Sequence, residues 1–315
     1  MKVHYYAWSV LLLLVPALLF VSCEEDEMDP TVVEFAQDNT QFSILVDALE
    51  AADLVDALND RSAELTVFAP TNTAFEAFLS ENGYQSLDDV PVATLRQVLS
   101  YHVLGTKQMS DKLEDQYYPT LAEFAPNAPL NLYVDTRAGV KINADVDVTA
   151  ADTEVDNGVI HTVDKVINPA NVVTLALSNP MFSNLIAALT RTDLQADFVG
   201  ILSGDGPFTV FAPTNTAFEN LLAAVPEWNT LADIPRETLE TVLSYHVIAN
   251  ANVRAAQIVD DAPVTTFEGR TFSIDLTAGT PTITTASDGT AGIIATDVQG
   301  TNGVVHAIDA VLLPE

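Results

Sequence analysis

The chain has 315 residues, and its 44 Asp and Glu against 12 Lys and Arg give a formal net charge of −32. A surface this acidic repels nucleic acid phosphates and anionic lipid headgroups, which excludes both as expected partners. The hydrophobic content of 48% is ample for packed cores, and the length suits two domains of roughly 100–200 residues each.

The N-terminal segment has the pattern of an export signal. The apolar run Ala7–Val21 is shorter than the roughly 20 residues that a membrane-spanning helix needs. We therefore predict a signal peptide over residues 1–22. Ser22 stands directly before Cys23, the only cysteine, and resembles the lipoprotein box of bacterial exported proteins. That resemblance implies that Cys23 is lipidated and anchors the chain to a membrane; the alternative is an inert thiol in the signal.

Residues 23–30 form the predicted lipidated start and acidic spacer of the mature chain. Glu24–Glu27 is a run of four acidic residues. One interpretation is a solvated spacer. The other is a resemblance to the surface-export signals of Bacteroidetes-type lipoproteins, which implies exposure on the outer membrane. A position on the periplasmic side of that membrane stays open.

The rest of the chain is a duplication. Three motifs recur at offsets of 143 to 145 residues, which is far longer than the period of about 20–50 residues in solenoid repeats. We predict one domain over residues 31–168 and a second over residues 169–315, with a linker so short that the two domains are in contact or held at a fixed angle. The recurring motifs are Thr66–Glu76 with Thr209–Glu219, Val98–Val103 with Val242–Val247, and Asn157–His161 with Asn302–His306.

Each copy begins with predicted helices. An amphipathic helix over residues 42–55, and its counterpart over 181–189 with Asn179 as cap, shows apolar residues at helical spacing. A short buried strand follows at 65–69 and 208–212, and a second helix with capping-box spacing starts at Thr73 and Thr216. The polar pairs Thr71-Asn72 and Thr214-Asn215 could form a ligand site at this helix N-terminus, but capping and turn formation explain them adequately. A third helix, after 89–91 and 233–235, carries a Tyr-His pair on its last turn.

The second half of each copy is strand-like. Residues 131–135 and 140–143 alternate between apolar and polar, as do residues 271–276 and 281–284, with glycine turns between them. Each copy closes on an apolar strand, 158–164 or 303–309. Helices followed by strands within one unit predict an α+β domain.

The motifs taken together resemble a fasciclin domain, twice. Thr-Val-Phe-Ala-Pro-Thr-Asn, Tyr-His and Asn-Gly-Val-(Ile/Val)-His occur in the same order at nearly equal spacing in both copies. The resemblance implies a β-sandwich-like wedge with several packed helices, and an extracellular role in cell adhesion or matrix contact.

The same resemblance supplies candidate contact residues. The family's Tyr-His motif is associated with recognition by adhesion receptors, and its Asp-Ile element is matched closely by Asp297-Val298 but departs at Asp152-Thr153. The second copy is therefore the better candidate for a contact. The predicted interaction residues are Tyr101, His102, Tyr245, His246, Asp297 and Val298.

Of the five histidines, His4 falls in the predicted signal peptide, and the other four are two positions seen twice. They could act as metal ligands or proton shuttles, but a structural role is favoured. His102 and His246 fall on the apolar stripe of a helix, and His161 and His306 sit in an apolar strand, so each is expected to bond a backbone group. Clustered Cys and His at zinc-site spacing are absent from the sequence, and neither a metal nor a cofactor is predicted.

Acidic residues and reactive side chains complete the candidate sites. Asp145 and Asp147 share a strand face, which leaves calcium binding open, although most such acids are simply solvated. The sequence holds no nucleophile elbow, phosphate loop or His-Glu-x-x-His motif, so we predict no enzyme activity.

Three functional hypotheses follow. The first is a surface-anchored adhesion lipoprotein that acts by binding a protein or polysaccharide at the cell surface, including another copy of itself. The second is a lipoprotein that captures polysaccharide or small ligands for an uptake system, with Tyr117, Tyr118 and Trp228 as exposed aromatics. The third is a periplasmic scaffold.

Overall fold

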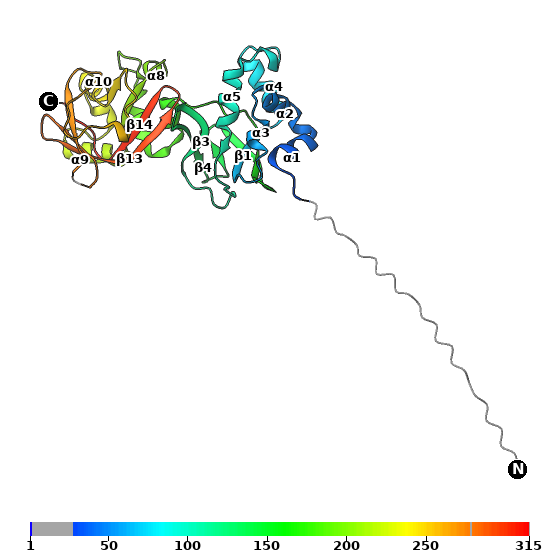
Figure 1. Cartoon of the computed structure of the whole chain (residues 1–315). Helices are drawn as coiled ribbons and strands as arrows, with labels where there is room; N and C mark the ends of the chain where they lie inside the picture. The colour runs from blue at the N-terminus through cyan, green and yellow to red at the C-terminus, as the bar shows by residue number, and fades with distance from the viewer. Residues whose placement is uncertain (2–27, 278, 315) are drawn as a thin grey trace.

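The computed structural model describes Met1 and residues 28–277 and 279–314 (Figure 1). The predicted signal peptide, Cys23 and the acidic run Glu24–Glu27 lie outside the described residues. Within the described part, no single helix is long and apolar enough to cross a membrane; one pair, Val172–Ser178 with Pro180–Leu189, passes by length and composition but is bent by 100°.

Each copy contains one seven-stranded sheet. The first has the strand order β2-β1-β7-β6-β5-β4-β3, and the second has β10-β11-β12-β13-β14-β8-β9. In each sheet one pair of neighbouring strands is parallel and the others are antiparallel: β1 is parallel to β7, and β8 is parallel to β14. The strands of the first sheet are β1 Leu65–Pro70, β2 Val103–Leu104, β3 Gln116–Ala125, β4 Ala128–Asp135, β5 Lys141–Ile142, β6 Val146–Val155 and β7 Gly158–Val163.

The second sheet repeats this arrangement with shorter outer strands. Its strands are β8 Phe208–Pro213, β9 Val247–Ala249, β10 Val264–Thr265, β11 Thr271–Asp275, β12 Thr282–Thr285, β13 Thr290–Gly300 and β14 Gly303–Ile308. The strands β1 and β8 each lie second from an edge of their sheet and are buried at all six positions, as their β-branched and aromatic residues predict. The α+β prediction is confirmed, because both copies combine such a sheet with packed helices.

The helices of both copies occupy matching places. Domain 1 has α1 Val32–Asp38, α2 Ser43–Ala51, α3 Val55–Leu58, α4 Asn72–Glu81 and α5 Val92–Tyr101, with 3₁₀ turns η1 Thr40–Phe42 and η2 Leu87–Asp89. Domain 2 has α6 Val172–Ser178, α7 Ser183–Leu189, α8 Phe198–Leu202, α9 Asn215–Ala224 and α10 Arg236–Tyr245, with η3 Pro180–Phe182, η4 Leu231–Asp233 and η5 Ala255–Gln257.

Two predictions about the helices need correction, and two short helices were not predicted. The single helix expected over residues 42–55 is broken after α2, because Asp53 adopts a left-handed conformation (φ 55°), and Val55 starts α3. The helix cap is Thr71, not Thr73: its hydroxyl accepts a hydrogen bond from the Ala74 amide at 3.3 Å. The short helices α1 and α6 were not predicted.

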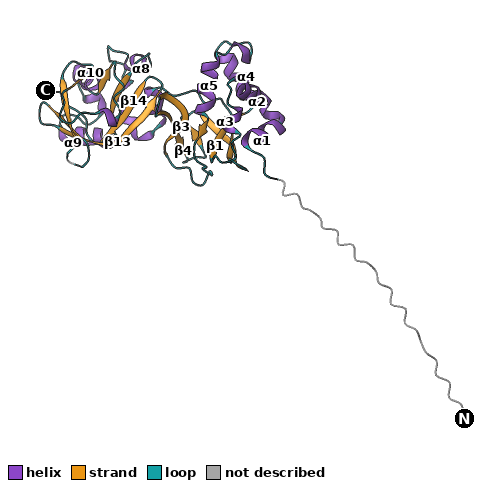
Figure 2. Ribbon diagram, in the orientation of Figure 1, coloured by secondary structure: helices purple, strands orange, loops and turns teal. Residues whose placement is uncertain are grey.

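The two domains share a core. Leu130 and Leu132 of β4 belong to the same buried cluster as Leu175 of α6 and Val298 of β13. Figure 2 shows the strands β3 and β4 between the helices of domain 1 and the strands of domain 2. The Gln299 amide donates to Asn131 Oδ1 at 2.8 Å across this junction. The predicted contact between the domains is therefore confirmed.

The long β3–β4 hairpin makes much of the junction. Tyr117 on β3 donates its hydroxyl proton to the Leu175 carbonyl oxygen of α6 at 2.7 Å, and Arg254 of domain 2 donates to the carbonyl oxygen of Asn127 at the hairpin tip. The matching strands of domain 2, β10 and β11, are only two and five residues long. The two copies therefore differ in the length of this hairpin, which makes much of the contact between domain 1 and domain 2.

Candidate interaction site

The Tyr-His pair of domain 1 lies in the core. Tyr101 ends α5 with 0% of its surface exposed, and His102 caps the helix with 2% exposed. His102 Nδ1 donates to the Val98 carbonyl oxygen at 2.7 Å, because a carbonyl can only accept. Its Nε2 accepts from the Ile167 amide at 2.8 Å. The ring is thus neutral and ties α5 to the segment that follows β7.

Tyr101 is equally committed to the fold. Its hydroxyl donates to the Asn131 carbonyl oxygen at 2.5 Å and accepts from Asn143 Nδ2 at 3.1 Å. Burial raises the pKa of Tyr101 well above its ordinary value, so the hydroxyl stays protonated. Since Asn131 also accepts from Gln299, Tyr101 supports the strand that contacts domain 2.

Domain 2 repeats these contacts. His246 donates from Nδ1 to the Val242 carbonyl oxygen at 2.7 Å and accepts at Nε2 from the Leu312 amide at 2.9 Å. The Tyr245 hydroxyl donates to the Thr271 carbonyl oxygen at 2.8 Å. Burial lowers the pKa of His102 and of His246 to about 4, so both rings are neutral at neutral pH.

The prediction that Tyr101, His102, Tyr245 and His246 contact a partner is at odds with this structure. All four are buried, and a side chain without accessible surface cannot touch a second molecule. The structural interpretation of His102 and His246 is the one that the hydrogen bonds support. The pair can influence an interaction only by positioning the elements around it.

The Asp-Ile element proves equivalent in the two copies. Asp297 and Asp152 both adopt left-handed backbone conformations, at φ 61° and 62°, within bulges of β13 and β6. Asp297 Oδ1 accepts from the Ala255 amide at 2.7 Å, and Asp152 Oδ1 accepts from the Ser110 amide at 2.7 Å. Both carboxylates therefore hold equivalent loops, and the two copies share the backbone and the loop contact of this element.

The remaining histidines support these bulges. His161 Nε2 donates to the Gln108 carbonyl oxygen at 2.9 Å while Nδ1 accepts from the Asp152 amide at 3.2 Å. His306 makes the same pair of bonds to Val253 and Asp297, at 2.9 and 3.4 Å. Burial is the main cause that lowers the pKa of both rings. Val298, the last predicted contact residue, is itself buried.

The Asn-Gly motif, whose role the sequence did not reveal, is also structural. Asn157 Oδ1 accepts from the Val32 amide at 2.9 Å at the start of α1, and its Nδ2 donates to the Leu58 and Asp60 carbonyl oxygens. Asn302 does the same for Val172 at the start of α6. A Cβ atom added to Gly158 would lie 2.1 Å from the Leu65 carbonyl oxygen, so only glycine fits there.

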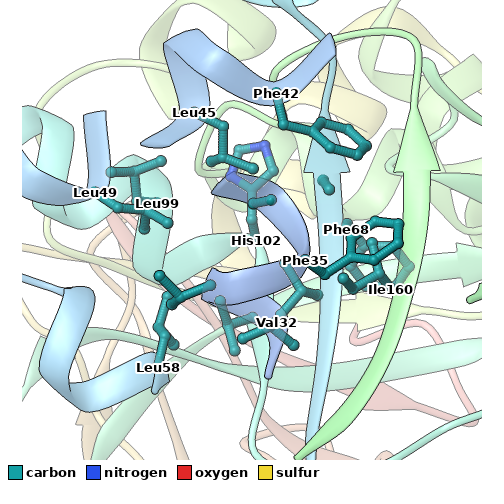
Figure 3. A pocket seen from close by; sticks show the side chains of 15 residues that line it. Val32, Phe35, Phe42, Leu45, Leu49, Leu58, Phe68, Leu99, His102 and Ile160 are labelled. Atoms are coloured by element: carbon teal, nitrogen blue, oxygen red, sulfur yellow. The ribbon is translucent and has the colours of Figure 1, made fainter. Parts of the chain in front are cut away.

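A small cavity lies among the helices of domain 1. Figure 3 shows its lining, which includes Phe42, Leu45, His102 and Ile160. Its volume is about 20 Å³, which is room for about one water, and its walls are almost wholly apolar. The cavity is a packing defect and cannot hold a ligand.

The aromatics proposed for ligand capture are mostly unavailable. Tyr118 is buried, and Tyr117 bonds across the domain junction, so the prediction of exposed aromatics is wrong for both. Trp228 is half-buried and lines a groove of about 470 Å³ together with Thr241, Arg270 and Leu313.

The acidic pair considered for calcium is occupied by lysines. Lys165 Nζ lies 2.6 Å from Asp145, and Lys141 Nζ lies 2.6 Å from Asp147. Among the described residues, no group of three or more His, Cys, Asp or Glu could hold a metal ion. The two carboxylates considered for calcium are therefore paired with lysines in this structure.

Comparison with known proteins identifies the architecture. The fasciclin domain profile matches residues 40–169 and 180–314. The chain is 30% identical over 252 residues to transforming growth factor-beta-induced protein ig-h3 of Sus scrofa, which covers 79% of this chain but 35% of that protein. It is 28% identical to human periostin over 79% of this chain and 28% of periostin.

Two further similarities bear on the domain pair and on a bacterial relative. The cell surface glycolipoprotein MPB83 of Mycobacterium bovis is 36% identical over 150 residues, 45% of this chain and 60% of that protein. The structure of a FAS1 domain pair from the insect cell adhesion molecule fasciclin I superposes with a TM-score of 0.51 at 20% identity, covering 89% of this chain and 95% of that one. The chain spans about a third of the length of its animal relatives. With profile matches over most of its length, this chain belongs to the fasciclin family and consists of two tandem fasciclin domains.

Proposed function

We propose that this protein is exported, anchored to the outer membrane through a lipid on Cys23, and exposed at the cell surface, where it acts by binding. The names of its relatives support a surface role: one is a cell surface glycolipoprotein and another is a cell adhesion molecule. The anchor rests on Ser22-Cys23 and the outward orientation on Glu24–Glu27. The proposed partner is a protein or a polysaccharide of the cell surface.

One observation carries the choice of binding over catalysis. The polar side chains of the shared motifs bond to the fold itself: His102 and His246 to backbone groups, Asn157 and Asn302 to helix starts, and Thr71 to the amide of Ala74. Groups held in this way are not free to act on a substrate. What the two domains offer a partner is therefore their outer surface.

The charge of that surface narrows the class of partner. Every Lys and Arg in the described part of the chain forms an ion pair with an Asp or Glu, so the net negative charge is left to uncompensated carboxylates. An anionic polymer such as nucleic acid would be repelled. The partner is expected to be neutral or cationic where it meets the acidic faces.

Proteolysis of intact cells tests the proposed location. We expect added protease to cleave the protein, detected by immunoblot, while a periplasmic marker survives. Changing Cys23 to Ser should release the protein from the membrane fraction. Protection until the outer membrane is broken would replace the surface adhesin with the periplasmic scaffold. Unchanged attachment and aggregation of surface-exposing cells that lack the protein would contradict adhesion.

The Trp228 groove favours capture of sugars as a second candidate. An aromatic face beside Thr241 and Arg270 is a suitable surface for a sugar ring and its hydroxyls. If this candidate holds, a glycan array probed with the protein should give signals that Trp228→Ala removes, whereas Tyr117→Phe should keep them, because Tyr117 lies at the domain junction. Signals that survive Trp228→Ala would dismiss the groove as the sugar site.

A further inference from the structure

One stretch of this acidic chain carries no charge. Residues 166–190, between Lys165 and Arg191, contain no Asp, Glu, Lys, Arg or His, and no other run without these residues is as long. The stretch includes α6, η3 and α7, the helical start of domain 2. From the start of α6 to Thr190, which follows α7, the exposed side chains are Leu177, Met181, Ser183, Ala187 and Thr190, and we call them the uncharged face.

The matching positions of domain 1 are occupied by different kinds of residue. Its helices α1, η1 and α2 match α6, η3 and α7 residue by residue, and the corresponding positions are exposed in both domains. At these positions domain 1 is polar or acidic: Gln37 and Gln41 stand for Leu177 and Met181, and Asp47 and Glu50 stand for Ala187 and Thr190. The fold therefore does not require apolar or uncharged residues there.

The contact between the domains explains only part of this difference. Leu175 is fully buried against domain 1, where its counterpart Phe35 is half-buried. Leu177 and Met181 remain 53% and 37% exposed in the assembled pair. Exposed apolar residues grouped on one face of a protein mark an interaction site more often than single scattered ones do.

We infer that the uncharged face binds the same face of a second copy of this chain. Two copies of so acidic a protein repel each other in most orientations. When the uncharged faces of two copies meet, residues 166–190 place no carboxylate in the contact, because this stretch contains none. At its end, Arg191 is paired with Asp193 at 2.6 Å, so those charges offset each other.

If both copies use the uncharged face, the dimer has two-fold symmetry. In an isologous dimer each patch meets its own copy, so apolar residues on one chain face apolar residues on the other. The face also continues the established contact of α6 with domain 1, since Tyr117 bonds to Leu175 two residues before Leu177. A membrane surface fits less well, because the face has neither the basic nor the aromatic residues of interfacial helices.

Sedimentation velocity of the full chain, as isolated from cells in density-matched detergent, tests this dimer. We expect a dimer at micromolar concentration that becomes tighter as salt screens the remaining carboxylates. The variant Ala187→Asp with Thr190→Glu introduces the residues that domain 1 carries at the same positions. It should weaken association at least tenfold without a change in the midpoint of thermal unfolding beyond a few degrees.

The reciprocal variant in domain 1 is the matched control. Gln37→Leu with Gln41→Met adds the same apolar side chains to a face that keeps its acids, and should leave the association constant unchanged. A wild-type protein that stays monomeric at 100 times that concentration would overturn the proposal. Equal dimerisation of the acidic variant and the wild type would overturn it as well.

Discussion

Replacing Asn302 by Ala is expected to lower the free energy of unfolding by roughly 3 kcal/mol or more. Its Oδ1 accepts from the Val172 amide at 3.0 Å, and its Nδ2 donates to the Leu202 and Gly204 carbonyl oxygens at 2.8 and 2.7 Å. The side chain is almost fully buried, so water cannot replace it for all three groups. Each buried group left without a partner costs about 1–3 kcal/mol.

Urea unfolding of the variant at neutral pH measures this loss. Asn157→Ala should lose a similar amount, because Asn157 makes the same three contacts in domain 1. Asn229→Ala is the control, since Asn229 is exposed and its side chain caps nothing. A loss for Asn302→Ala no greater than for Asn229→Ala would show that the asparagine does not hold the start of α6.

The duplication let the sequence predict most of the fold, and it also located these asparagines without explaining them. Repetition of Asn157-Gly158 at Asn302-Gly303 showed that the motif matters. Its hydrogen-bond partners come from elements about 100 residues away, such as Leu58 for Asn157. Local pattern carries no information about such distant partners, so their role became apparent only from the structure.

Short elements escaped prediction for a different reason. The helices α1 and α6 have seven residues each, which is about two turns and too few for a periodic pattern to stand out. Capping at Thr71 was predicted, but the capping-box spacing of Thr73 and Glu76 offered a second start for the helix, and the structure shows that this second start is not used. Asn72, the first residue of the helix, fixes the turn at Thr71: its side chain accepts a hydrogen bond from the Ile44 amide and donates one to the Thr40 carbonyl oxygen.

The sequence also predicted some features of the candidate site correctly and others wrongly. Helical spacing correctly placed His102 and His246 on the apolar face of their helices. The prediction that their neighbours Tyr101 and Tyr245 contact a partner came from resemblance alone, and both are buried. The uncharged face could have been found from the sequence, because a gap in charge between Lys165 and Arg191 needs no structure to be seen. Its exposure could not.

Acid is expected to destabilise the protein through the two buried Tyr-His histidines. In the folded state the pKa of His102 and of His246 is about 4, because burial opposes the charged ring, against about 6.5 in the unfolded chain. Between pH 6.5 and pH 4 the unfolded state therefore binds protons that the native state does not. The stability due to the neutral rings is complete above pH 6.5 and is lost as the pH falls toward 4.

The expected loss is about 3 kcal/mol for each histidine between pH 7 and pH 4, measured as the free energy of unfolding in urea. The local geometry gives the reason: a proton on His102 Nε2 would face the Ile167 amide proton, which that nitrogen now accepts. His246 meets the Leu312 amide in the same way. Protonation must therefore break a buried hydrogen bond as well as place a charge in the core.

A variant with Gln in place of both histidines separates their contribution from that of the many carboxylates. Gln can donate and accept in the same pocket but does not titrate, so its protein should start less stable at pH 7 and lose less between pH 7 and pH 4. The carboxylates with lowered pKa, such as Asp135 beside Arg137, lose stability with acid in both proteins and cancel in the difference. Parallel curves for the two proteins would mean that His102 and His246 do not set the acid limit. A shallower curve for the variant would mean that His102 and His246, which were predicted as contact residues, instead make stability sensitive to acid through their hydrogen bonds at the ends of α5 and α10.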